Sequence, residues 1–284
     1  MERAAVESVA DLAPAAVQPA PKRPNALRLW LQSLVLPLLA LAIFLVLWIV
    51  AVAVFHPPAY LYPTPVSMFV AIRDNWASLL ESTLITLQGT VWSFLLSALL
   101  GGLIALVLSG IPLLYKALFP YTVIIQTIPI IAVAPIIIIW FGLGMPSIVA
   151  CALLIAIFPV IANTTVGLRS TDASLRQLFM LYGATRWQTL IKLQLPFALP
   201  YFFAGLRIAA GASVVGAVVG EYMAGMGGNR GGLGFLIAET ASRLQMSMLF
   251  SAALASALLG ILFFMVIGAI SNHFLKSWHE SASN

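Results

Sequence analysis

The chain has 284 residues, of which 62% are hydrophobic and 8% are charged. A soluble fold of this length needs a far more polar surface, so the composition excludes a water-soluble globular protein and predicts a polytopic membrane protein. The formal net charge of +5 does not indicate a nucleic-acid partner, because Lys and Arg stand in ones and twos beside apolar runs, where membrane topology explains them. The single cysteine, Cys151, excludes a disulfide framework.

Apolar runs long enough to cross a membrane follow one another along the chain. A hydrocarbon core about 30 Å thick requires about 20 apolar residues per helix. Residues 1–28 are rich in Ala and Pro and are predicted to be a disordered tail, and the run after them is too long for a secretory signal. An all-α transmembrane domain over residues 29–276 and a short tail over 277–284 are expected. The six predicted spans are Leu29 to Phe55, Leu84 to Ser109, Ala117 to Leu143, Ser147 to Val166, Tyr201 to Ala224 and Met248 to Phe274.

The distribution of Lys and Arg predicts that both termini are cytoplasmic, since cytosolic loops carry an excess of these residues. Arg207 is expected about one turn inside the fifth span, close enough to the cytosolic edge for its side chain to reach the headgroups. The cytosolic set is Arg3, Lys22, Arg23, Arg28, Lys116, Arg169, Arg176, Arg186, Lys192 and Lys276, against Arg73, Arg230 and Arg243 outside.

Two segments are predicted on the outer side. Residues 57–65 contain four prolines and predict a stiff extended loop, followed by a short interfacial helix over 66–76 with Phe69, Ile72 and Trp76 on one face. The glycine-rich run 225–234 predicts a flexible loop, because no strand precedes it and its spacing does not fit a phosphate-binding loop. A short amphipathic stretch to Leu244 comes after it.

Several kinds of chemistry are excluded by what the chain lacks. No G-x-x-x-x-G-K-[ST] motif occurs, so any ATP, with its Mg²⁺, is expected on another subunit, and no cofactor is expected on this chain. The three histidines, His56, His273 and His279, stand at span ends or in a tail, where neither a zinc pair nor a Ser/His couple can form. The chain is therefore not expected to be an enzyme or to hold a metal.

A polar segment, residues 167–200, separates the fourth and fifth spans. The pattern predicts a helix from Asp172 to Tyr182, a break at Gly183, and a second helix that Thr185 caps and Pro196 and Pro200 stop. The second helix is amphipathic, so it fits the groove of a soluble partner. It equally fits a helix resting on lipid with its basic residues on headgroups, and both alternatives stay open.

At these residues the chain resembles the permease subunits of binding-protein-dependent ABC importers, in the branch for nitrate, sulfonates, taurine and pyrimidine precursors. The resemblance covers most of the chain, from Pro63 to the C-terminus. Its ordered motifs are Gln126-Thr-Ile-Pro129, Ala134-Pro135, Trp140-Phe-Gly142-Leu-Gly144, Phe158-Pro159, Asn163-Thr164, Gly183-Ala-Thr-Arg-Trp-Gln188, Leu195-Pro196-x-Ala198-Leu-Pro200 and Gly220-Glu221.

The resemblance implies a type I importer fold in a bacterial inner membrane, with a second permease copy, two cytoplasmic ATPase subunits and an extracytoplasmic binding protein as partners. Segment 167–200 would be the coupling loop, pushed by the ATPases. The family usually has Glu-Ala-Ala starting six residues before the glycine, whereas Gln177-Leu-Phe179 stands here without the carboxylate. The implied coupling residues are Gln177, Gly183, Ala184, Arg186, Trp187, Lys192 and Pro196.

Polar residues inside the apolar spans are candidates for the translocation path, because such groups need a partner or a water-lined path. They are Gln126, Asn163, Thr164 and Glu221. For Gln126 and Asn163 the alternative is an interhelical hydrogen bond, and Glu221 is expected to reach water at the outer end.

Prolines and small residues shape two of the spans. Pro129 and Pro135 are expected to distort the third span. The stripe Ala212, Gly216, Gly220 and Ala224 predicts a close helix contact, with a contact across a dimer as one option.

The predicted function is the permease subunit of an ATP-driven importer that moves a small solute, such as a sulfonate, nitrate, taurine or a vitamin precursor, by alternating access. The alternative is a secondary transporter driven by an ion gradient, which normally buries charged relays at mid-bilayer. A purely structural membrane anchor is a third interpretation. The sequence does not select the substrate.

Overall fold

The structure is a computed structural model that describes residues 26–56, 58, 61–224 and 231–279. Over these residues it contains helices and no strand, as predicted. The chain divides into two units, residues 1–56 and 57–284, and each is described by itself.

In unit 1 the structure describes one helix, α1 (Ala26–Phe55). Its 30 residues extend about 45 Å at 1.5 Å per residue, more than the hydrocarbon thickness of a bilayer. From residue 35 onward its side chains are mostly exposed and apolar on every face. This is the composition of a helix that lies in lipid, as predicted for the first span, although the helix starts three residues before Leu29. The predicted tail up to residue 25 lies outside the described residues.

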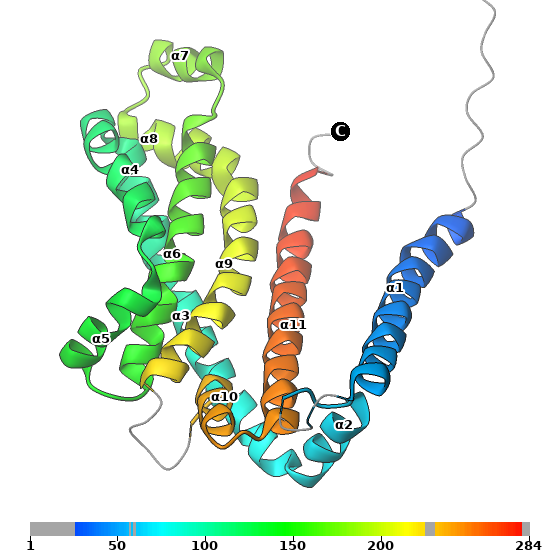
Figure 1. Cartoon of the computed structure of the whole chain (residues 1–284). Helices are drawn as coiled ribbons and strands as arrows, with labels where there is room; N and C mark the ends of the chain where they lie inside the picture. Colours follow the sequence, from blue (N-terminus) through cyan, green and yellow to red (C-terminus); the bar gives the residue numbers. More distant parts are fainter. Residues whose placement is uncertain (1–25, 57, 59–60, 225–230, 280–284) are drawn as a thin grey trace, which may run out of the picture. The chain divides into compact units, whose positions relative to one another are not determined.

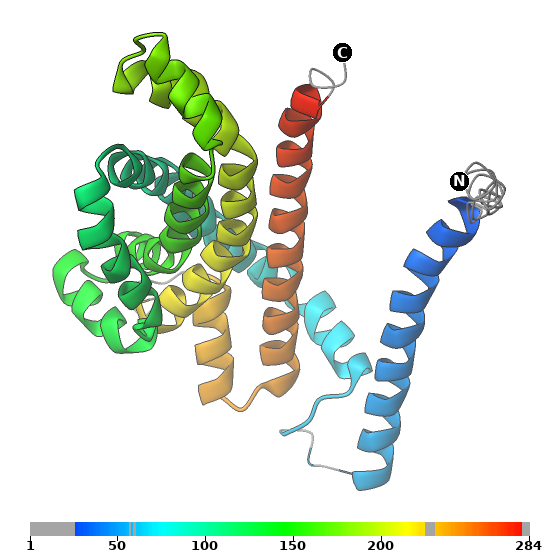
Figure 2. The ribbon, with the colours of Figure 1, turned by 90° about the horizontal axis from the view of Figure 1, so that it is seen from above.

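Unit 2 contains the remaining elements, and its middle is formed by three long helices. The elements in chain order are α2 (Pro65–Asp74), α3 (Trp76–Gly110), α4 (Pro112–Thr127), α5 (Ile130–Phe141), α6 (Met145–Arg169), α7 (Ala173–Leu181), α8 (Arg186–Thr189), the π-helical η1 (Leu190–Gln194), α9 (Leu195–Ala224), α10 (Leu233–Ser242) and α11 (Met246–His279). α6 packs against both α3 and α9, α11 packs along α9, and α5 packs on the other flank (Figures 1 and 2).

Small residues bring α6 and α9 close together. A Cβ added at Gly216 would lie 2.5 Å from the Cα of Ala152, and one at Gly220 would lie 3.0 Å from the Cα of Ile148. Only glycine permits this approach, which supplies van der Waals contact where lipid removes the hydrophobic driving force between helices. The predicted small-residue stripe is therefore a contact within the chain, and the option of a contact across a dimer was wrong for Gly216 and Gly220.

The third span is not one helix. α4 ends at Thr127, α5 begins at Ile130, and the two helices are bent by 99° at this break. Pro129 lacks the N–H that would continue the α4 ladder, and Ile128 before it adopts an extended conformation (ψ 122°). The predicted distortion is confirmed at Pro129, but its size was missed. Within the described residues, five helices are long and apolar enough to cross a membrane, and the bent pair is the sixth candidate.

The fifth span is longer than predicted, because the helix does not stop at Pro196. Helical structure continues from Arg186 to Ala224, 39 residues, with Pro196 in the first turn of α9 and Pro200 inside it. η1 accounts for this continuity: its wider turn places the Leu195 N–H on the Leu190 carbonyl, so the chain re-registers just before the proline. Arg207 lies about 18 Å along α9 from its first residue, Leu195.

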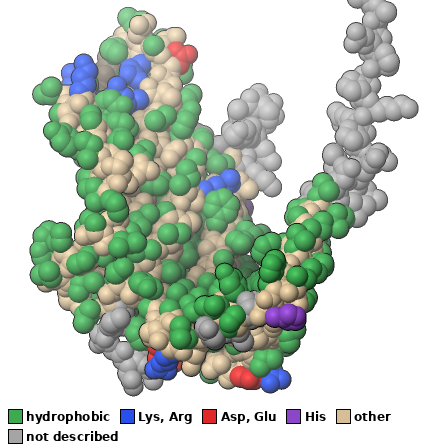
Figure 3. All heavy atoms as spheres, viewed as in Figure 1, with side chains coloured by type: hydrophobic (Ala, Val, Ile, Leu, Met, Phe, Trp, Pro, Cys, Tyr) green, Lys and Arg blue, Asp and Glu red, His purple; other side chains and the backbone are tan. Residues whose placement is uncertain are grey.

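The two ends of unit 2 differ in what they present. α7, α8 and the C-terminal end of α11 lie at one end, and α2 and α10 lie at the other (Figure 1). Figure 3 shows apolar side chains over the flanks between them, with Lys and Arg at the α7 end, others beside Asp or Glu at the opposite end, and one group between the two. That this end faces the cytosol stays a prediction from the Lys and Arg distribution.

The predicted interfacial helix is present as α2, but its predicted face is divided. Phe69 is exposed, whereas Ile72 packs against the core cluster that contains Leu79 and Met248. Trp76, also exposed, already belongs to α3. α2 therefore contributes to the core of unit 2 through one side only.

Candidate functional site

The coupling loop predicted over residues 167–200 folds as two helices joined by a glycine turn. Asp172 caps the N-terminus of α7, and its carboxylate accepts hydrogen bonds from the N–H and the hydroxyl of Ser174 at 2.7 and 2.8 Å. These bonds lower the pKa of Asp172 below its ordinary value of 3.8, because they stabilise the charged form. Gly183 follows α7 with φ +71°, a conformation that favours glycine.

The second helix starts with a capping box. The Gln188 N–H donates to the Thr185 hydroxyl, and the Thr185 N–H donates back to the Gln188 side chain at 2.8 Å. This reciprocal pair satisfies two backbone donors and fixes the direction in which α8 leaves the turn. The predicted helix break at Gly183 and cap at Thr185 are confirmed, and the second helix continues through η1 into α9.

The α7–α8 hairpin displays apolar side chains that nothing in the described chain covers. α7 has no buried residue, and the exposed fractions of Leu181, Tyr182 and Trp187 are 84%, 83% and 72%. Such side chains clustered at a turn mark a surface that another protein or a membrane covers. We call residues 180–182 and Trp187 the hairpin tip. Of the predicted coupling residues, Gln177, Gly183, Arg186, Trp187 and Lys192 are exposed, and Ala184 and Pro196 are half-buried.

The predicted path residues do not converge within one chain. Gln126 is exposed near the end of α4, beside the break. Asn163 bonds within its own helix, because its side-chain amide donates to the Pro159 carbonyl at 2.8 Å. The interhelical bond expected for Asn163 is therefore absent from the described contacts. Along α6, Asn163 lies about 22 Å from Ile148, the residue that contacts Gly220 beside Glu221.

Thr164 lines an apolar hollow between α3, α6 and α9. The hollow measures about 460 Å³, and its walls include Leu99, Leu103 and Phe202. The Thr164 hydroxyl is buried and has no hydrogen-bond partner among the described residues. This hollow is therefore not the path of a charged solute such as a sulfonate, since nothing in its wall replaces the hydration of an ion.

Glu221 does not reach water, contrary to the expectation. Its side chain is 0% exposed, and its Oε2 accepts hydrogen bonds from the Thr86 hydroxyl at 2.8 Å and the Gly234 N–H at 2.9 Å. The Thr86 hydroxyl also accepts from the Leu233 N–H at 2.8 Å. A carboxylate in contact with the first turn of a helix is stabilised by the unpaired N–H groups there. We call Thr86, Glu221, Leu233 and Gly234 the Glu221 clasp.

The clasp joins three helices at the α10 end of unit 2. Thr86 lies on α3, Glu221 on α9, and Leu233 and Gly234 on α10. Glycine is required beside it, because a Cβ at Gly232 would collide with the Glu221 carboxylate and one at Gly234 would collide with the Val218 carbonyl. Oε1 of Glu221 is buried without a partner in the described part of the chain. The clasp therefore attaches α10 to both long helices.

Sequence reasoning missed the α3 side of this site. Buried hydroxyls recur on α3 about every turn, at Ser82, Thr86, Thr90, Ser93 and Ser97. Spacing of three and four residues places them on one face of the helix, which packs against α6 and α9. Ser and Thr spaced three and four residues apart inside an apolar run are the sequence signal that indicates a polar helix face in the interior of the bundle.

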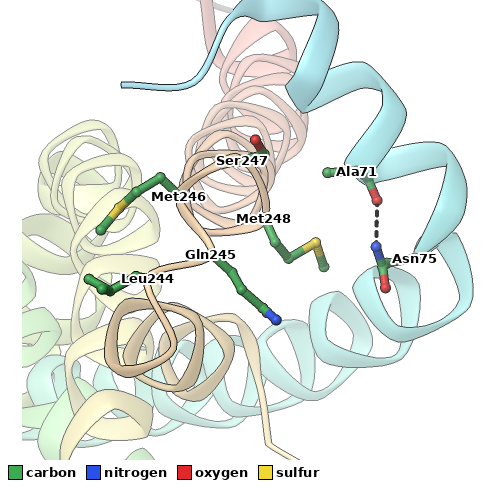
Figure 4. A pocket seen from close by; sticks show the side chains of 7 residues that line it. All are labelled: Ala71, Asn75, Leu244, Gln245, Met246, Ser247 and Met248. Carbon is green, nitrogen blue, oxygen red and sulfur yellow. Dashed lines mark hydrogen bonds between the residues drawn. The ribbon is translucent and has the colours of Figure 1, made fainter. Parts of the chain in front are cut away.

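A second hollow lies at the α10 end, between α2 and the turn from α10 to α11. It measures about 480 Å³, with Asn75, Gln245 and Ser247 as its polar lining and Leu244 at its edge (Figure 4). The Asn75 side chain donates to the Ala71 carbonyl at 3.0 Å across its wall. Leu244 adopts φ +56° and is exposed, a conformation that L side chains rarely take.

Comparison with known proteins decides the family. Residues 97–278 match the family model described as binding-protein-dependent transport system inner membrane component. The chain belongs to this family. It is 33% identical over 241 residues to a probable ABC transporter permease protein of Haemophilus influenzae, covering 85% of this chain and 97% of the relative. It is 35% identical over 245 residues to the formylaminopyrimidine transport permease protein ThiX of Halalkalibacterium halodurans, covering 86% and 96%.

A third relative shows that the family resemblance extends beyond one kind of solute. The putative aliphatic sulfonates transport permease protein SsuC of Bacillus subtilis is 30% identical over 258 residues, covering 90% of this chain and 88% of the relative. The chain is therefore an integral membrane permease subunit of an ABC transporter, as its resemblance implied. The exposed hairpin tip and the buried clasp are features of that permease.

Proposed function

We propose that this permease forms the translocation path of an ATP-driven importer in a bacterial inner membrane. A separate cytoplasmic ATPase, which binds ATP and Mg²⁺, docks on the α7–α8 hairpin, and an extracytoplasmic binding protein delivers the solute at the α10 end. A second permease copy completes the path, since the four polar candidates lie apart within one chain. The solute is a small molecule of the kinds named for the relatives, a pyrimidine precursor or a sulfonate.

The observation that carries this proposal is the hairpin tip. Four side chains at one turn, Met180, Leu181, Tyr182 and Trp187, are exposed although the hairpin backbone is fixed by two caps and a glycine turn. A preorganised apolar knob can enter a groove of a partner at low entropic cost. Coupling then needs no carboxylate at Gln177, because the contact is apolar. ATP-driven movement of the groove would be transmitted through α8 and η1 directly into α9, as one continuous helix.

The decisive experiment measures uptake in liposomes that contain the permease, its ATPase and its binding protein. We expect uptake to require ATP and to continue after ionophores have collapsed the proton and sodium gradients. Uptake by the permease alone in response to a gradient would contradict the proposal.

One observation favours the alternative, a transporter driven by an ion gradient. Glu221 is a buried acidic residue of the kind such transporters use. Its carboxylate, however, is held by a hydroxyl and a backbone N–H at the end of α9, and no second titratable side chain among the described residues bonds to it. The ionophore experiment separates the two functions, because only the alternative loses uptake with the gradient.

A further inference from the structure

Arg207 is a charged residue of α9 that the proposed function does not use. It lies on the side of α9 that faces α11, away from the stripe of small residues that packs on α6. Its Nη2 donates to the Gly268 carbonyl at 3.2 Å and to the Asn272 side-chain oxygen. These two acceptors hold the guanidinium between α9 and α11.

The positive charge of Arg207 is not neutralised by the described residues. No carboxylate there lies within ion-pair distance, and both acceptors are uncharged. Both bonds come from Nη2, the Nε is buried without a partner, and Nη1 has no bond among the contacts of the described residues. A guanidinium has five N–H donors; with both Nη2 donors bonded and the Nε buried, the two donors of Nη1 are left for an anion.

The level of this charge along α11 matches the edge of a bilayer. In the sequence the apolar run of α11 ends at Leu275, before Lys276 and three residues after Asn272, a distance of about 5 Å along the helix. The nearby side chains Ile208, Ile270 and Phe274 are exposed and apolar, so this face lies in hydrocarbon rather than in water. The rings of Phe203 and Phe274 stack at 5.8 Å between centroids and flank the charge toward the end of the bundle.

We propose that Arg207 binds the phosphate of an anionic phospholipid at the α9–α11 face, on the membrane surface nearest the α7 end. An arginine just inside the apolar layer extends its head toward the headgroups, and the Nη1 group of Arg207, which has no other bond among the described residues, donates to the phosphate oxygens in a charge-assisted contact. Anionic lipid adds a net negative charge that a zwitterionic lipid lacks, so the site prefers the anionic headgroup. The lipid would bridge α9, which continues from the hairpin, and α11.

The test is lipid binding by the purified full-length chain, measured by native mass spectrometry in graded phosphatidylglycerol or phosphatidylcholine. We expect the wild-type chain to retain phosphatidylglycerol in preference to phosphatidylcholine. Arg207→Gln should weaken phosphatidylglycerol binding about five-fold, the effect of one basic residue near an anionic surface, and Arg207→Lys should weaken it less. The matched control is Arg243→Gln, which removes an exposed arginine paired with Glu239 at the opposite end and should change nothing.

Three results would overturn the proposal. They are equal binding of the two lipids to the wild type, unchanged phosphatidylglycerol binding in Arg207→Gln, and displacement of the lipid by inorganic phosphate or by a soluble sulfonate, which would indicate a site for free anions. If Arg207→Gln does not fold, the wild-type comparison of the two lipids and the displacement by free anions still decide between the outcomes. None of these measurements involves the ATPase, so they are independent of the proposed function.

Discussion

Replacing Thr86 by valine tests whether the Glu221 clasp holds α10 in place. The substitution keeps the shape of the side chain and removes one hydroxyl, which donates to Glu221 at 2.8 Å and accepts from the Leu233 N–H at 2.8 Å. Glu221 Oε2 would keep only the Gly234 N–H as a donor, and the Leu233 N–H would lose its acceptor. Each buried polar group left unsatisfied costs about 1 to 3 kcal/mol. We therefore expect the substitution to lower the free energy of local opening of α10 by about 2 to 4 kcal/mol.

Hydrogen–deuterium exchange of the α10 amides measures this cost directly, because exchange of protected amides follows local opening. A loss of about 2 kcal/mol corresponds to exchange about 30-fold faster. The matched control is Thr90→Val, one turn further along α3, which removes a buried hydroxyl that has no partner among the described residues. That control should leave α10 unchanged or more protected, since it removes an uncompensated polar group. If α10 exchanged equally in both variants, the hydrogen bonds of Thr86 would not stabilise α10 and the reasoning would fail.

Three further predictions concern packing, the hairpin and pH. Gly216→Leu should reduce the yield of folded protein, because the new side chain meets the Ala152 backbone and this overpacking costs about 1 to 3 kcal/mol or more. Gly211→Leu has open space around the new side chain and should be tolerated. Size-exclusion profiles in detergent measure the difference. Gly183→Val should cost about 1 to 2 kcal/mol by forcing a branched residue to φ +71°, and should lower ATP-dependent uptake more than the amount of permease in the membrane; uptake per folded permease equal to wild type would contradict a coupling role. The lowered pKa of Asp172 means that its cap stabilises α7 above pH about 4 and that this stabilisation is lost as the pH falls through the folded pKa. In the wild type the Ser174 amide should therefore exchange faster at low pH, after correction for intrinsic exchange rates. In Asp172→Ala it should exchange faster at all pH values.

Local sequence signals predicted the hairpin correctly, because each of its features is encoded within a few residues. Asp172 caps α7 through Ser174, Thr185 caps α8 through Gln188, and Gly183 supplies the positive φ between them. The long apolar runs predicted the spans for the same reason, since a bilayer imposes helix on every such run. The error at Pro196 arose because the π-helical turn before it shifts the register of the helix, and no sequence signal marks that turn. Pro200 stands inside α9 without ending it.

The Glu221 clasp could not be predicted, because its partners lie far apart in the sequence. Thr86 is 135 residues from Glu221 and 147 from Leu233. A glutamate near a span end ordinarily reaches water, and only the packing of α3, α9 and α10 encloses this one. The break between α4 and α5 was anticipated from Pro129, but its angle of 99° depends on tertiary packing that a single proline does not specify.

The central claim is that the hairpin tip is the contact through which an ATPase drives this permease. The most direct measurement is co-purification of the ATPase with Leu181→Asp/Tyr182→Asp, together with ATP-dependent uptake. The matched control is Leu254→Asp/Leu258→Asp, two exposed apolar side chains on α11 away from the hairpin. We predict that the tip variant loses the ATPase and uptake while its insertion and folding stay normal, and that the control, where it folds, retains the ATPase. A tip variant that still holds the ATPase and transports at the wild-type rate would contradict the account.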